Sequence, residues 1–130
     1  MISTKGRYAL RVMIDIAENG GKFVPLKDIA KRQDISKKYL EIIVRDLVRY
    51  ELIKGSSGKG GGYSLCKNVE DYSVGEIVEA TEGPIVTVAC LSENSPKCPR
   101  SGLCKTLPLW KELEKTVHGF LFSKKLSDLI

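Results

Sequence analysis

The sequence predicts a mainly α fold with a small two-stranded β element and a long C-terminal helix. Three observations predict it. Apolar residues recur at three- and four-residue steps in the segments 3–19, 26–32, 36–49, 72–82 and 107–122. Two short alternating segments flank a glycine-rich stretch at 56–61. The last helical segment carries an apolar stripe that is wide for a chain of 130 residues.

The first three helices are predicted to lie close together in space. Residues 3–19 end at Asn19 and Gly20, and a short strand or turn at Phe23 and Val24 leads into the second helix, 26–32. Residues 33–36 form the turn, and Ser36 is the expected N-cap of the third helix. Two helices joined by about four residues match a helix-turn-helix.

The third helix is followed by a predicted hairpin. Its strands contain Leu52 and Ile53 on one side and Tyr63 and Leu65 on the other, with the tip at 56–61. A helix that displays polar side chains, followed by a flexible basic hairpin, is typical of a winged helix-turn-helix domain. Lys37, Lys38, Glu41 and Arg45 fall mostly on the outer faces of that helix.

The charge of the chain is unevenly distributed. The formal net charge is +5, but residues 1–67 hold 14 Lys and Arg against 7 Asp and Glu, whereas residues 68–130 hold 7 against 9. The basic half coincides with the predicted helix-turn-helix, which favours a nucleic-acid surface over a merely solvated one. Lys5 is near the expected path of backbone phosphates. The glycines at 60–62 favour close approach to DNA, with a permissive hairpin end as the alternative.

The second half is predicted to contain a fourth helix, a loop and the long helix. The fourth helix ends at Glu82 before Gly83 and Pro84, and residues 85–89 resemble a short apolar strand. The expected division is a DNA-binding domain at 1–82, a cysteine-containing loop at 83–106 and a dimerisation helix with a C-terminal turn at 107–130. A homodimer is expected, the alternative being a helix folded back on its own domain. The predicted dimer residues are Trp110, Leu113, Val117, Phe120 and Leu121.

Three of the four cysteines lie in one loop. Cys90, Cys98 and Cys104 are separated by seven and five residues, a spacing wider than the two-residue gaps of structural zinc sites. An iron–sulfur cluster accepts ligands spread over such a loop, and three unrelated thiols are the alternative. The fourth ligand is left open among a carboxylate, the Cys66 thiol, a small molecule and the other subunit. Cys66 itself is expected to be a half-buried structural residue.

Other protein classes are disfavoured. The chain has one His and no legible nucleophile–base pair or phosphate-cradling motif, which argues against an enzyme. No apolar run approaches membrane-spanning length and no leader is evident, so a cytoplasmic protein is expected. A pure interaction module would show no DNA affinity that falls steeply with salt.

Several motifs resemble one known family. They are Ser3-Thr-Lys-Gly-Arg-Tyr-Ala9, Ile35-Ser with Tyr39-Leu-Glu41, Gly60-Gly-Gly-Tyr63, Val74-Gly-Glu-Ile77, and Cys104 followed by Trp110. In this order, over essentially the whole chain, they resemble the bacterial IscR/NsrR/CymR family of transcriptional regulators. The resemblance implies a winged-helix dimer that binds palindromic double-stranded DNA and senses iron–sulfur status, nitric oxide, redox state or a metabolite.

The resemblance also assigns residues. Ser36, Lys38, Tyr39 and Glu41 fall where the recognition helix meets base edges, and Ser57, Lys59 and Gly60 fall in the wing tip. The three loop cysteines match the ligands of cluster-bearing members, with two-iron and four-iron forms both open. Leu107 and Arg7 stand where other members carry a fourth ligand. IscR-like members also carry an Arg in the wing, near the position that Ser57 occupies here. A metal-free thiol switch with the same DNA binding is the alternative.

Overall fold

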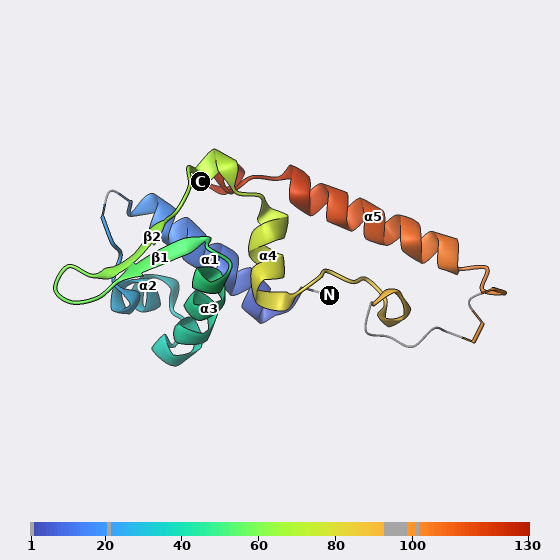
Figure 1. The fold of residues 1–130 in the computed structure, drawn as a ribbon, viewed down its shortest axis with the longest axis horizontal. Coiled ribbons are helices and arrows are strands. Elements are labelled where there is room, and N and C mark those ends of the chain that lie inside the picture. Colours follow the sequence, from blue (N-terminus) through green and yellow to red (C-terminus); the bar gives the residue numbers. More distant parts are fainter. Residues whose placement is uncertain (1, 21, 93–98, 101) are drawn as a thin grey trace.

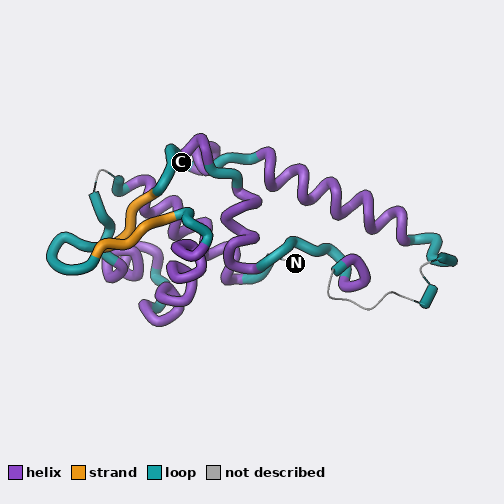
Figure 2. Tube along the Cα trace, viewed as in Figure 1, coloured by secondary structure: helices purple, strands orange, loops and turns teal. Residues whose placement is uncertain are grey.

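The computed structural model describes residues 2–20, 22–92, 99–100 and 102–130. Helices dominate these residues, and the strands form a single antiparallel hairpin (Figure 2). The element order is as follows: α1 Thr4–Glu18, α2 Leu26–Gln33, α3 Lys37–Arg49, β1 Ile53–Ser56, β2 Gly62–Leu65, η1 Val69–Asp71, α4 Val74–Glu82, η2 Ala89–Leu91, α5 Leu107–Ser123 and η3 Leu126–Leu129. Figure 1 shows α1–α4 and the hairpin gathered together, with α5 extending away from them. The predicted winged helix-turn-helix fold is confirmed.

Hydroxyl side chains begin three of the helices. Ser3, Ser36 and Ser73 each accept a hydrogen bond from a backbone N–H in the first turn of the helix that follows. Behind these caps, the apolar stripes of α1, α2 and α3 meet in one core around Met13, Ile29 and Leu40. The expected bounds of these helices agree with the structure to within one or two residues.

The helix-turn-helix turn is stabilised by a polar network around Asp15, which is 1% exposed. Its carboxylate accepts hydrogen bonds from Arg32 Nε and Nη2 at 3.0 and 2.7 Å and from Gln33 Nε2 at 2.9 Å. Arg11 donates in turn to the side-chain and backbone oxygens of Gln33. A buried charge is tolerated only when it is paired in this way, so the network fixes the end of α2 against α1.

The hairpin is the expected wing. β1 and β2 pair antiparallel with Gly55 opposite Tyr63. Val24 adds an isolated bridge to Tyr63. The Val24 N–H donates to the Tyr63 carbonyl at 2.8 Å, and the Val24 carbonyl accepts from the Tyr63 N–H at 2.9 Å. The segment at Phe23 and Val24, expected to be a short strand or turn, therefore contacts β2 through one bridge and ties the wing to the start of α2.

The C-terminal helix returns to the domain. α5 begins far from the body of the molecule and runs back toward it (Figure 1), packing mainly against α4. Phe122 lies over Gly75, where an added Cβ would stand 2.2 Å from the ring, so this contact requires glycine. After α5, the turn η3 places the fully buried Leu126 in the same core as α1, α2 and α3.

Two expectations from the sequence are wrong. Residues 85–89 form no strand, because no other strand runs beside them within the described residues; only Ile85 is buried, against Val74 and Val78. Cys66 is exposed rather than half-buried, because β2 ends at Leu65 and the chain then turns away from the core. Among the described residues, no helix is long and apolar enough to cross a membrane.

Candidate nucleic-acid interface and cysteine loop

The outermost row of α3 carries three cations. Successive residues are rotated by about 100° around a helix, so Lys38, Ile42, Arg45 and Arg49 fall within a narrow sector opposite the buried Leu40. All four residues of this row are exposed. Lys38 and Arg45 form no ion pair with any described residue, whereas Arg49 Nη2 lies 3.0 Å from Asp46 Oδ1. We call these four residues the outer row.

The side of α3 that faces α1 is already engaged by the protein. Lys5 Nζ lies 2.6 Å from Asp46 Oδ2, and Tyr39 makes an edge-on contact with Tyr8 at 5.7 Å between ring centroids. Arg11 lies over the other ring of this pair, 5.0 Å from the Tyr8 centroid. Lys5 and Tyr39, two of the DNA-binding candidates, therefore help to hold α3 in place.

The side of α3 that faces the wing is open. A hollow of about 450 Å³ separates Glu41, Arg45 and Val48 of α3 from Gly55 and Tyr63 of the wing. Glu41 is exposed, and its side chain makes no hydrogen bond or ion pair with any residue the structure describes. Its carboxylate is free to accept a hydrogen bond from a ligand in this hollow.

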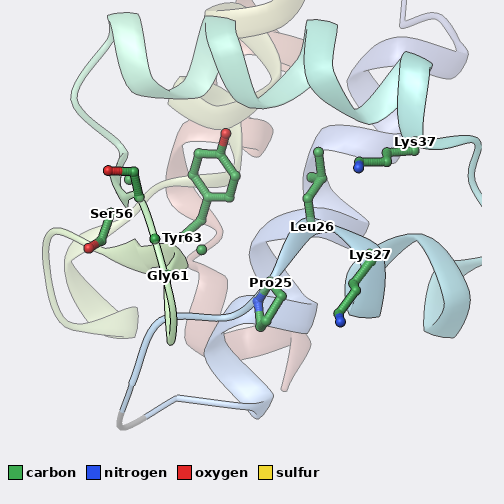
Figure 3. Close-up of a pocket in the computed structure, with 11 residues that line it drawn as sticks. Pro25, Leu26, Lys27, Lys37, Ser56, Gly61 and Tyr63 are labelled. Carbon is green, nitrogen blue, oxygen red and sulfur yellow. The ribbon is translucent and has the colours of Figure 1, made fainter.

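A larger groove of about 640 Å³ lies between the wing and the helix-turn-helix. Figure 3 shows Tyr63 at its centre, with Ser56 and Gly61 of the wing on one side and Leu26, Lys27 and Lys37 of the two helices on the other. Lys27 and Lys37 are exposed, and no described carboxylate pairs with them. The groove thus combines two free ammonium groups with exposed backbone, which suits an anion such as a phosphate.

Close backbone packing within the protein accounts for two of the wing glycines. A Cβ on Gly61 would lie 2.3 Å from the Ser56 carbonyl oxygen, and one on Gly62 would lie 2.3 Å from the Val24 carbonyl oxygen. Gly60, at φ +79°, faces open space. Packing of the hairpin therefore explains two of the three consecutive glycines, and the tip around Ser57, Lys59 and Gly60 is exposed.

The structure locates two of the three loop cysteines. Cys90 lies exposed in η2, and Cys104 lies half-buried just before α5, while Cys98 is outside the described residues. The Cys104 Sγ lies 3.3 Å from Thr106 Oγ1, and this contact, with backbone N–H groups and Arg100 nearby, lowers the pKa of the thiol. Among the described residues, no three metal-ligating side chains come together. Cys104 is thus suited to a thiolate role, as a ligand or as a reactive group.

The apolar stripe of α5 divides into two faces. Val117 and Leu121 pack against the Val74 and Val78 side of α4, so they are covered by their own chain. Leu109, Leu113 and Phe120 lie along a second line and are 55%, 42% and 58% exposed. Trp110 is half-buried. Of the predicted dimer residues, Leu113 and Phe120 are therefore free to contact another molecule, and Leu109 joins them.

Sequence reasoning missed two exposed apolar residues of α3, Ile42 and Val48. Ile42 is 41% exposed and is the one apolar member of the outer row. Counting in steps of four and three from Lys38 would have found it, because that count separates it from its buried neighbour Ile43.

Comparisons with known proteins match the whole chain. Residues 2–130 match the model of the Rrf2 family, described as iron-dependent transcriptional regulators. The chain is 41% identical to the protein rrf2 of Nitratidesulfovibrio vulgaris, over 99% of this chain and 86% of the relative. It is 35% identical to the transcriptional regulator IscR of Klebsiella pneumoniae, over 99% of this chain and 78% of the relative.

Solved structures agree with these relatives. The structure of CymR, the global cysteine regulator of B. subtilis, superposes with a TM-score of 0.79 at 35% identity, over 99% of this chain and 95% of that one. IscR of T. potens superposes with the same TM-score at 32% identity, over 99% and 85%.

Proposed function

Because the chain belongs to the Rrf2 family of transcriptional regulators, we propose that it binds palindromic double-stranded DNA as a homodimer in the cytoplasm. The observation that carries this proposal is the outer row of α3. Three cations lie along it, and Lys38 and Arg45 have no carboxylate partner among the described residues. A helix with such a row fits the major groove, where phosphates flank the base edges.

The groove beside the wing supports the same mode of binding. With α3 in the major groove, Lys27 and Lys37 face one phosphate strand, and the tip residues Ser57, Lys59 and Gly60 extend along the duplex. Ser36, whose hydroxyl caps α3, lies beside Lys37 at the end of the helix that enters the groove. Glu41 is placed to accept a hydrogen bond from a cytosine amino group.

The exposed line on α5 supports the proposed dimer. Leu109, Leu113 and Phe120 recur on one face of a helix that otherwise packs mainly on α4. An aligned apolar face of this kind is stabilised when two copies bury it against each other around a twofold axis. Two recognition helices would then read half-sites about 34 Å apart.

The salt dependence of DNA binding tests the interface. Affinity for a selected duplex is measured by fluorescence anisotropy between 50 and 300 mM salt, concentrations of the order over which phosphate contacts weaken strongly. Lys38→Ala and Arg45→Ala are expected each to lower the slope of log affinity against log salt by about one for each phosphate contact removed. Lys115→Ala, on α5, is the matched control and should leave the slope unchanged. Equal slopes for all four proteins would contradict the proposed interface.

We further propose that Cys90, Cys98 and Cys104 hold an iron–sulfur cluster. The donor chemistry fits, because the environment of Cys104 favours the thiolate and Cys90, the other loop cysteine that the structure describes, is exposed. When bound, such a group supplies a redox-sensitive iron centre. The loop 83–106 joins α4 to α5, so ligation of its thiols would fix the domain relative to the dimer helix. Loss of ligation would change the spacing of the two recognition helices.

Anaerobic purification tests this part separately. Iron, acid-labile sulfide and operator affinity are measured for the wild type and for Cys98→Ala, with Thr116→Ala, in α5 and outside the cysteine loop, as the control. Loss of iron and sulfide and a changed affinity in Cys98→Ala alone are expected. If Cys98→Ala leaves all three quantities unchanged, the cluster proposal is wrong while the DNA-binding proposal stands.

A metal-free thiol switch is the second candidate. The observation that favours it is the lowered pKa of the Cys104 thiol, because thiolates are the form that oxidants attack. Protein without iron whose DNA affinity changes reversibly with oxidant and reductant would support the switch over the cluster.

A further inference from the structure

Ile42 occupies the middle of the surface that α3 presents to solvent. Lys38 precedes it by one turn, and Arg45 and Arg49 follow it, so cations border it along the outer row. It is 41% exposed and belongs to neither of the two hydrophobic clusters of the described residues. An isolated exposed aliphatic side chain needs no special explanation on most surfaces. Here it lies in the outer row of a basic helix, on the side opposite the buried Leu40.

The neighbouring residues show that this position is not an extension of the core. Val44 and Leu47 face inward and are almost fully buried. Val48, which is 39% exposed, lies toward the wing and lines the hollow beside Tyr63. Ile42 is about 120° around the helix from Val48, away from the wing. Burial of Ile42 therefore requires another molecule.

Resting on the proposed DNA binding, we propose that Ile42 is a specificity-determining residue that contacts the C5-methyl group of a pyrimidine in the major groove. The charge of the surrounding row identifies the occupant, because three cations select a polyanion. Within the major groove, the C5-methyl group is the apolar feature of a base edge, and thymine carries it. A 5-methylcytosine presents the same group, so both bases share the chemistry that Ile42 recognises.

Replacement of thymine by deoxyuridine tests the contact, since it removes the methyl group and keeps every hydrogen-bonding atom. A preferred duplex is first selected from random DNA with the wild-type protein. Each thymine is then replaced in turn, and the dissociation constant is measured at fixed salt. Removal of one buried methyl group predicts about a fourfold loss of affinity for each half-site that is changed. The loss is expected at a single thymine position, which recurs in both half-sites. In Ile42→Ala, the ratio of thymine to uracil affinity at that position should fall to about one.

A second arm separates the two sources of the methyl group. If the position selected is cytosine, methylation of C5 should strengthen wild-type binding about fourfold and leave Ile42→Ala unaffected. Leu129→Ala is the control, as an aliphatic residue of similar exposure, 43%, that lies in η3 and outside the proposed interface, and it should retain the wild-type ratios. Thermal melting checks that both variants fold. Both are expected to fold, because neither side chain lies in the core.

The outcomes are distinguishable from those of the proposed function. If no sequence is enriched and binding is indifferent to salt, DNA binding fails and this inference fails with it. If a sequence is enriched but no methyl group affects affinity, or the same ratio persists in Ile42→Ala, the role of Ile42 alone is overturned.

Discussion

The hydroxyl of Tyr72 donates a hydrogen bond to the carbonyl oxygen of Leu52 at 2.6 Å. The hydroxyl oxygen of Tyr72 in turn accepts from the backbone N–H groups of Cys66 and Lys67 at 2.8 and 3.0 Å. One fully buried side chain thus joins the residue before β1 to the two residues after β2. The base of the wing is closed by this side chain, so the position of the wing beside α3 depends on it.

Tyr72→Phe should destabilise the protein by about 1–3 kcal/mol, because it leaves three backbone groups at the base of the wing without their partner. Urea denaturation followed by circular dichroism measures the change. Tyr50→Phe is the control, since Tyr50 is 56% exposed and should change stability by less than about 0.5 kcal/mol. Equal effects of the two substitutions would contradict the role of Tyr72.

The same hydroxyl predicts a loss of stability at alkaline pH. Burial raises the pKa of Tyr72 above its ordinary value, although hydrogen bonds from the Lys67 and Cys66 N–H groups oppose the shift. The unfolded chain therefore releases this proton first as the pH rises. The contribution is fully present below about pH 10, the unfolded value, and is lost as the pH rises from there through the folded pKa. Denaturation curves between pH 8 and 11 should show a smaller decline for Tyr72→Phe than for the wild type.

Asp15→Asn tests the network that holds α1 to α2. The substitution removes the charge that accepts from Arg32 and Gln33 and should destabilise the protein by about 1.5–3 kcal/mol. Asp34→Asn is the matched control, because Asp34 is exposed with φ 53°, a conformation that asparagine tolerates. Differential scanning calorimetry of the two variants gives the comparison. A melting temperature for Asp15→Asn equal to that of the control would refute the network's role.

Leu113→Glu tests the exposed face of α5. A charge at the centre of the line from Leu109 to Phe120 would have to be buried without a partner, so the dimer should dissociate and DNA affinity should fall. Light scattering coupled to size-exclusion chromatography measures the mass. Lys115→Glu introduces the same charge off this line and should leave the dimer intact. A monomeric wild type, or a dimeric Leu113→Glu, would contradict the proposed interface.

Local signals predicted the helices and the wing well. Ser36 and Ser73 mark the caps of α3 and α4, and the apolar period behind them places the buried faces. Residues 85–89 were misread because β-branched residues favour strands only where a neighbouring strand exists to pair with them. Local composition carries no information about that neighbour.

The candidate site could be predicted only in part. Lys38 and Arg45 are exposed as the period of α3 predicts, but the ion pair of Lys5 with Asp46 joins residues 41 positions apart. In the same way, the division of the α5 stripe depends on Phe122 packing over Gly75, a contact between distant segments. Such partners are set by tertiary packing, which periodicity within one helix does not encode.

The lowered pKa of Cys104 predicts selective alkylation. Its contacts with Thr106, first through the side chain and then through the backbone, favour the thiolate. Because iodoacetamide reacts with the thiolate, the labelling rate at Cys104 should rise at lower pH than the rate of an ordinary thiol of pKa about 8.5. Metal-free reduced protein is labelled between pH 6 and 9.5, and the rate at each cysteine is followed by peptide mass spectrometry. Thr106→Val should move the midpoint upward, whereas Thr116→Val, within α5, should not. A Cys104 midpoint at or above that of a free cysteine peptide would show that the thiolate is not favoured there, and would remove the support it gives to both the cluster and the thiol switch.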